Sequence, residues 1–144
     1  MGAQLVLLAV IVFAPSGRAW PVPGLLLTAA WLVAGAGVAT IVWGARSLGR
    51  EITPHPAPTP NATLRTDGPY RYVRHPIYSG VLLFAAGLTL ASGSALKAVA
   101  FVLLVVVLSI KAKFEEGLLA EHFPGYESYA RRTPRFVPRL RGGA

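Results

Sequence analysis

The chain has 144 residues, enough for one domain, and is 53% hydrophobic but only 14% charged. Soluble domains carry about 25% charged residues, so this composition excludes an ordinary soluble globule and a disordered chain. The absence of cysteine excludes disulfides and thiolate metal sites. The net charge of +8 does not indicate nucleic acid, because uncharged runs at 1–17, 19–45, 76–96 and 98–110 confine the charges to a few segments.

These runs predict an all-α, multi-pass transmembrane protein with about four spans, because about 20 helical residues cross the hydrocarbon core of a bilayer. The first span covers residues 3–13 and is short, with a signal peptide as the alternative. The second runs from Trp20 to near Arg46. A polar segment follows, and its alternating prolines at 54–60 indicate an extended linker.

The third and fourth spans are predicted to form a C-terminal helical hairpin. Pro76 suits a first helical turn, so the third span covers residues 77–91 and ends at Gly93. The fourth begins at Ala95 and continues as an amphipathic helix to His122. We treat residues 1–144 as a single domain whose motifs lie within 62–138.

The basic residues predict which side of the membrane each segment faces. Four spans place twelve Lys and Arg residues on one side and two, Arg18 and Lys97, on the other. Because cytoplasmic segments carry the excess of basic residues, both termini and the polar loop are expected in the cytoplasm. The basic tail, 131–141, is interpreted as a contact for anionic lipid.

Chemistry-bearing residues fall in two segments, 68–80 and 111–116, which the hairpin brings to its cytoplasmic end. Glu115 and Glu116 can bind a cation, although a solvated pair is the alternative. The helix start at His75 favours an anion such as a carboxylate. Tyr70 and Tyr78 offer ring faces, or anchor the chain at the interface. Together they fit a zwitterion with a nucleobase, such as S-adenosylmethionine, whereas the three histidines lack a metal-ligand spacing.

The pattern resembles the isoprenylcysteine carboxyl methyltransferase family, within a wider group that includes phospholipid N-methyltransferases. It consists of Leu64-x-Thr66-x-Gly68-x-Tyr70, then Arg74-His75-Pro76-x-Tyr78-x-Gly80, an apolar hairpin, Glu115-Glu116 and finally Phe123 with Tyr126-x-x-Tyr129. The resemblance covers more than half of the chain. It implies a small helical membrane enzyme that takes S-adenosylmethionine from the cytoplasmic side and a lipophilic acceptor from the bilayer.

The resemblance also implies residue roles. In the carboxyl methyltransferases an arginine one helical turn before the Glu pair is assigned to the acceptor carboxylate. Here that position is Lys111, which keeps the charge without the bidentate fork, and Arg74 is the other basic candidate for orienting the acceptor. The cofactor contacts carry over to Thr63, Leu64, Arg65, Tyr70, His75, Pro76, Ile77, Tyr78, Glu115 and Glu116.

We therefore expect methyl transfer to a lipophilic acceptor, with a carboxyl oxygen favoured as the methyl-accepting atom. One alternative is a membrane reductase of the sterol or steroid type, which would use NADPH and more arginines near His75; Arg65, Arg71 and Arg74 lie there. Another is a non-catalytic membrane module whose tail binds anionic lipid. Whether the protein binds S-adenosylhomocysteine or NADPH distinguishes the methyltransferase from these alternatives. Neither a metal nor nucleic acid is expected as a partner.

Overall fold

The computed structural model describes residues 2–49, 58 and 60–140, and these residues form helices joined by short connections. The α-helices are α1 (Gly2–Phe13), α2 (Gly24–Leu48), α3 (Pro76–Ser92), α4 (Ala95–His122) and α5 (Tyr126–Arg132), with a short 3-10 helix, η2 (Gly68–Arg71), before α3. No strand occurs in the described part of the chain. The all-α prediction is confirmed. Most of the predicted proline-rich linker lies outside the described residues.

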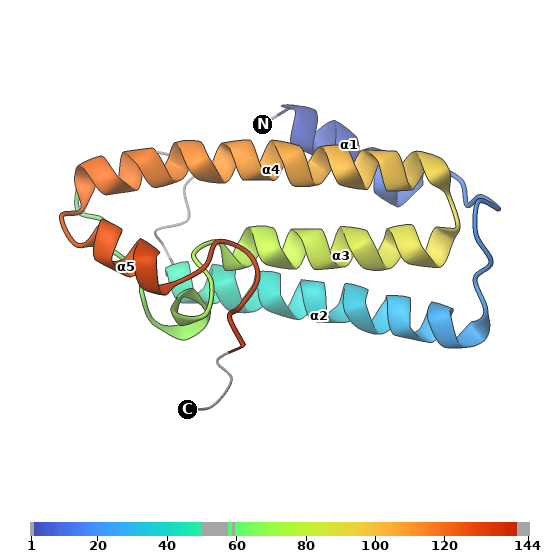
Figure 1. The fold of residues 1–144 in the computed structure, drawn as a ribbon, viewed down its shortest axis with the longest axis horizontal. Coiled ribbons are helices and arrows are strands. Elements are labelled where there is room, and N and C mark those ends of the chain that lie inside the picture. Colours follow the sequence, from blue (N-terminus) through green and yellow to red (C-terminus); the bar gives the residue numbers. More distant parts are fainter. Residues whose placement is uncertain (1, 50–57, 59, 141–144) are drawn as a thin grey trace.

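The four longer helices run alternately back and forth, with α1 and α4 in one layer and α2 and α3 in the other (Figure 1). The connections that precede α2 and α4 meet at one end of the bundle, where the amides of Gly17 and Ala19 donate to the carbonyls of Ser92 and Gly93. The short helix α5 folds back under the end of α4, and the chain then crosses the beginning of α3 (Figure 1). Segments far apart in sequence therefore converge at the opposite end of the bundle.

Two described helices, α2 and α4, are long and apolar enough to cross a membrane. At 1.5 Å per residue they measure about 37 and about 42 Å. The apolar helices α1 and α3 have 12 and 17 residues, fewer than the 18 that a candidate membrane-spanning helix needs. Length and composition thus support two spans, and the other two remain predictions.

The helix boundaries follow local sequence signals. Pro76 occupies the first position of α3, and Gly93 ends that helix in the left-handed conformation with φ 60°. Ser94 caps α4, its hydroxyl accepting from the amide of Lys97. The predicted start of the second span was wrong, because α2 begins at Gly24 after the extended residue Pro23.

Close backbone packing joins α2 to α3. A Cβ on Gly37 would lie 2.4 Å from the amide nitrogen of Phe84 and 2.6 Å from the carbonyl oxygen of Gly80. A Cβ on Gly80 would lie 2.7 Å from the Gly37 carbonyl oxygen. At these positions the two backbones therefore approach closely, as small residues allow in membrane helices. The predicted turn between α3 and α4 is present, but the close partner of α3 is α2.

The apolar core lies mainly between α1, α3 and α4. Its buried residues are Ile11, Ala85, Ala100, Leu104 and Leu108. Large apolar side chains on the outer faces of α2 and α4, such as Trp31, Leu32, Val102 and Ile110, are exposed. Apolar residues both inside and outside the bundle are the pattern of helices surrounded by lipid. The packing also fixes the beginning of α3 beside the last third of α4.

Candidate active site

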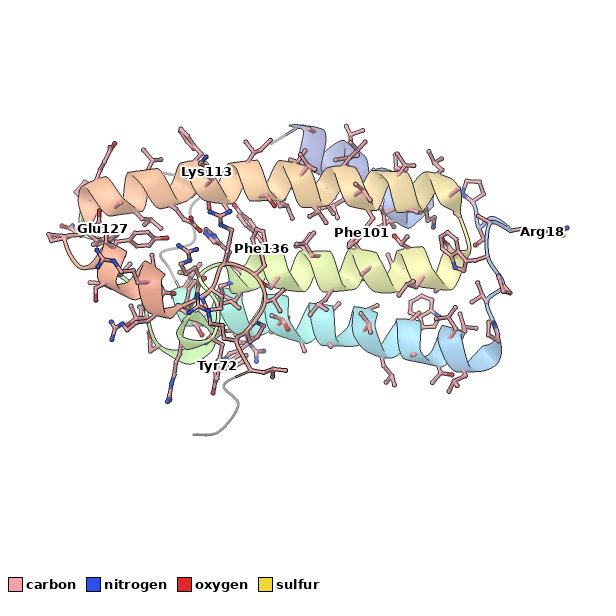
Figure 2. All side chains as sticks on the ribbon, viewed as in Figure 1. Arg18, Tyr72, Phe101, Lys113, Glu127 and Phe136 are labelled. Atoms are coloured by element: carbon pink, nitrogen blue, oxygen red, sulfur yellow. The ribbon has the colours of Figure 1, made fainter. Side chains whose placement is uncertain are left out.

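Charged and aromatic side chains gather where α3 begins and α4 ends, near Phe136 in Figure 2. His75 immediately precedes α3 and is 9% exposed. Its ring stacks parallel to that of Tyr78 with centroids 5.4 Å apart. Residues three positions apart share a helix face, and the contacts of both rings with Glu115 and Glu116 place that face toward α4.

Glu115 is held by the beginning of α3. The Tyr78 hydroxyl donates to Glu115 Oε1 at 2.6 Å, and His75 Nδ1 lies 3.8 Å from Glu115 Oε2. In the described part of the chain, the salt bridges to this carboxylate include no Arg or Lys partner. Glu115 therefore lacks the close arginine contacts of its neighbour Glu116 among the described residues, and its carboxylate can complement a cationic ligand.

Glu116, by contrast, contacts two arginines of the chain itself. Arg135 binds it in a bidentate manner, Nε to Oε1 at 2.9 Å and Nη2 to Oε2 at 2.8 Å. Arg74 Nη1 lies 3.4 Å from Oε2, and His75 Nε2 lies 3.1 Å from Oε1. The hydrogen bonds to Glu116 raise the pKa of Arg135, so the guanidinium stays charged. Two adjacent carboxylates thus have different surroundings.

The residues after α5 form one wall of the site, and we call Pro134–Phe136 the strap. The amide of Arg74 donates to the Pro134 carbonyl at 2.8 Å, and the amide of His75 to the Arg135 carbonyl at 3.1 Å. The Ser79 hydroxyl donates to the Phe136 carbonyl at 2.7 Å. The Phe136 ring meets the His75 ring edge-on, with centroids 6.1 Å apart. Backbone bonds thus fix the strap across the beginning of α3.

Tyr70, in η2, lies beneath this cluster and is 8% exposed. Burial raises the pKa of its phenol, the charge of Arg65 lowers it and that of Glu115 raises it, with a net upward direction. The phenol is therefore neutral at physiological pH. Tyr129 of α5 donates from its hydroxyl to the Tyr70 carbonyl at 2.6 Å, so α5 holds η2 in place.

Lys111 lies one helical turn before Glu115, on the side of the cluster that faces α1. Its Nζ is 5.1 Å from the centroid of the Tyr78 ring, within cation–π distance, and 3.4 Å from Gln4 Oε1. Gln4 is the only polar side chain of α1. The lysine therefore sits between the polar cluster and the apolar bundle.

The structure brings most of the predicted site residues together. Arg74, His75, Tyr78, Lys111, Glu115 and Glu116 are linked by direct contacts, and Tyr70 and Arg65 join them electrostatically. Pro76 and Ile77 instead face α2 at Gly44. Thr63 is exposed and Leu64 half-buried in the irregular segment before η2. Cofactor contact by any of these residues stays a prediction.

Sequence reasoning missed Arg135, Phe136 and Gln4 as site residues. The sequence predicts a lipid contact for the whole basic tail, whereas Arg135 of that tail is bound to Glu116. No periodicity relates positions 116 and 135, because the chain reverses direction between α4 and α5. A lone Gln in an otherwise apolar helix was the available signal for Gln4. Among the described residues, no group of three or more His, Asp or Glu is placed to hold a metal ion, and metal independence stays a prediction.

Comparison with known proteins points to methyl transfer. Residues 25–125 match the family described as phospholipid methyltransferase. The match contains His75, Tyr78, Lys111 and the Glu pair, but neither Gln4 nor the strap. It therefore covers most of the polar cluster and leaves its two flanks unassigned.

Similar curated proteins carry two kinds of name. The chain is 41% identical to the cobalt-zinc-cadmium resistance protein CzcN of Cupriavidus metallidurans over 81 residues, which is 56% of this chain and 38% of the relative. It is 35% identical to the protein-S-isoprenylcysteine O-methyltransferase of Schizosaccharomyces pombe over 77 residues, 52% of this chain and 33% of the relative. A second such methyltransferase, form B of Arabidopsis thaliana, is 35% identical over 77 residues, 52% of this chain and 39% of the relative. The chain thus spans well under half the length of these relatives.

Proposed function

The chain belongs to the phospholipid methyltransferase family, and on that premise we propose that it is a membrane enzyme transferring a methyl group from S-adenosylmethionine to a lipophilic acceptor. The observation that carries the proposal is the Tyr78–Glu115 pair at the beginning of α3, beside the charged cluster around Glu116. The names of the isoprenylcysteine O-methyltransferase relatives support the same reaction class.

The residues present fit the charge pattern of S-adenosylmethionine. Its ammonium and sulfonium groups are cations, and Glu115 is a partly buried carboxylate with no Arg or Lys ion pair among the described residues. Its carboxylate requires a positive environment, which the first turn of α3 supplies. NADPH has three phosphate groups and no sulfonium, so it offers Glu115 no cation comparable to those of S-adenosylmethionine. The charge pattern therefore favours S-adenosylmethionine.

The reaction requires positioning more than acid–base chemistry. When bound, S-adenosylmethionine supplies an electrophilic methyl carbon to the acceptor. An acceptor carboxylate carries no proton at neutral pH, so the chain needs no general base and contributes proximity and alignment. We propose a carboxyl oxygen as the methyl-accepting atom. Lys111, between the cluster and the bundle, is the group we assign to the acceptor carboxylate.

We also propose that the chain is a multi-pass protein with both termini in the cytoplasm. The polar cluster, the end of α4 and the described part of the tail lie at one end of the bundle, and Arg18 lies at the other (Figure 2). Twelve of the fourteen Lys and Arg residues of the sequence belong to segments assigned to the first end. The excess of positive charge favours the cytoplasm for that end.

Cofactor binding by purified full-length protein in detergent tests the proposal. Isothermal titration calorimetry should detect S-adenosylhomocysteine and give no heat of binding for NADPH. Labelled S-adenosylmethionine should then transfer its methyl group to a prenylcysteine carboxylate or to a component of a total lipid extract. Binding of NADPH alone would establish the reductase alternative instead. Binding of neither cofactor, with retention on anionic vesicles, would establish the non-catalytic lipid module.

A further inference from the structure

The strap is tied to the beginning of α3 more firmly than a lipid-binding tail requires. Three hydrogen bonds join its carbonyls to Arg74, His75 and Ser79, at 2.7 to 3.1 Å. The Phe136 ring covers the edge of the His75 ring. Residues before and after the strap are different: Arg131, Arg132 and Arg139 are exposed. Arg135 is thus the basic residue of the tail that contacts the site, whereas these neighbouring arginines are exposed.

Arg135 matches the Glu116 carboxylate in geometry. Both carboxylate oxygens receive a guanidinium hydrogen bond of less than 3 Å, which is the fork arrangement that Arg forms and Lys does not. The Glu116 side chain is 12% exposed, and that of Arg135 is 34% exposed. Removing Arg135 takes away both hydrogen bonds from a partly buried carboxylate that keeps only the looser Arg74 contact at 3.4 Å and the His75 contact at 3.1 Å among the described residues, which costs more than losing an exposed ion pair.

The pair also fixes His75. Glu116 Oε1, which accepts from Arg135 Nε, lies 3.1 Å from His75 Nε2, so the position of the carboxylate determines the position of the imidazole. The same imidazole stacks on Tyr78, whose hydroxyl holds Glu115. A chain of contacts therefore runs from Arg135 through Glu116, His75 and Tyr78 to Glu115.

We propose that Arg135 is a positioning residue for the cofactor site. Arg135 binds Glu116, so that Glu115 is the carboxylate of the pair that meets the cofactor's cation. This inference rests on the proposed function and assigns different roles to two adjacent glutamates. Glu116 is an internal counter-ion, and Arg135 acts through it without touching the cofactor. Arg135 lies outside residues 25–125, the segment matched to the family.

A double-mutant cycle on affinity for S-adenosylhomocysteine tests the proposal in full-length protein. Arg135→Ala should weaken binding by about 10- to 100-fold, the scale of a hydrogen bond to a charged group. Arg135→Lys should recover part of that loss, because it restores the charge without the fork. Arg135→Ala combined with Glu116→Ala should bind no more weakly than Arg135→Ala alone, since Arg135 acts only through the carboxylate that the double variant also lacks. The matched control is Arg131→Ala, which removes an exposed arginine whose salt bridge within the described part of the chain is with exposed Glu127 at 3.6 Å.

The possible outcomes distinguish failure of the positioning role from failure of the proposed function. If wild-type protein does not bind S-adenosylhomocysteine, the proposed function fails before Arg135 is tested. If wild-type binds and Arg135→Ala binds equally well while folded, the positioning role is wrong. If the losses from Arg135→Ala and Glu116→Ala multiply in the double variant, each side chain contacts the cofactor independently and the division of roles is overturned. A melting curve for each variant without ligand establishes that the measured protein is folded.

Discussion

The Tyr78 hydroxyl donates to Glu115 at 2.6 Å, joining the first turn of α3 to the last third of α4 across 37 positions of sequence. This bond fixes the rotamer of the glutamate and spares one carboxylate oxygen, which lies 3.8 Å from His75. The carboxylate is therefore oriented before a ligand arrives. Orientation in advance reduces the entropy lost on binding.

Replacing Tyr78 by Phe removes only this hydroxyl. Affinity for S-adenosylhomocysteine should fall by about 1.5–3 kcal/mol, because the lost bond is one to a charged group. Calorimetry at a fixed pH measures the loss. Tyr72→Phe is the matched control, since Tyr72 is 52% exposed and its ring contact is with Trp43. Equal affinity in Tyr78→Phe and wild-type protein would show that Glu115 needs no such orientation.

Direct removal of the carboxylate is the companion test. Glu115→Ala should weaken S-adenosylhomocysteine binding by at least as much as Tyr78→Phe, since it removes the charge together with its hydrogen bond. Calorimetry under the same conditions provides the comparison. The exposed residue Glu127, on α5, supplies the control variant Glu127→Ala. Affinity like that of wild type in Glu115→Ala would remove Glu115 from the cofactor site.

Gly37→Ala should destabilise the contact between α2 and α3. The added Cβ would meet the backbone of Phe84 at 2.4 Å, and backbone cannot rotate away as a side chain can. The expected loss is about 1–3 kcal/mol, the range for overpacking, and a thermal melt in detergent measures it. Gly35→Ala adds the same methyl group where nothing lies within 4 Å, and it should melt at or above the wild-type temperature. A melt of Gly37→Ala that matched this control would contradict the close packing.

The elements with local signals were predictable from the sequence. Pro76 and Gly93 delimit α3, and Ser94 caps α4, so both helices were placed to within about one residue. The start of α2 was not predicted correctly. The uncharged run includes residues 20–23, but Pro23 keeps the backbone extended and the helix begins after it.

The site was predictable in its residues but not in its pairings. Motif spacing placed His75 and Glu115 together, because a hairpin of two helices returns the chain to the same end. Nothing in the sequence distinguished Glu115 from Glu116. That difference comes from Arg135, which reaches the site only because α5 reverses the chain and the strap pairs with the backbone at 74 and 75. Long-range pairing of this kind leaves no periodic pattern.

Membrane orientation can be tested with a fusion. A reporter attached after Ala144 that is active only outside the cytoplasm should be silent, because the basic excess favours the cytoplasm for this end. The same reporter inserted beside Arg18, in the connection between α1 and α2, should be active. Fusion levels should be compared by immunoblot, so that silence is not loss of protein. Activity at both sites would show that the number of spans between the two insertions is even, and activity at Ala144 with silence beside Arg18 would reverse the orientation; either result would contradict the proposal.

Lys111→Ala should lower methylation while leaving affinity for S-adenosylhomocysteine within about twofold of wild type, because we place this lysine on the acceptor side of the cluster. Its Nζ lies over the Tyr78 ring and near Gln4 Oε1, facing the apolar bundle from which a lipophilic acceptor would enter. Lys111→Arg should keep or raise activity with a carboxylate acceptor, since a guanidinium can pair both oxygens. Lys113→Ala, an exposed lysine on the same helix, is the matched control. Initial rates over a range of acceptor concentrations, with calorimetry for the cofactor, separate the two sites. Equal loss of cofactor affinity and activity in Lys111→Ala, or no loss of either, would contradict the assignment.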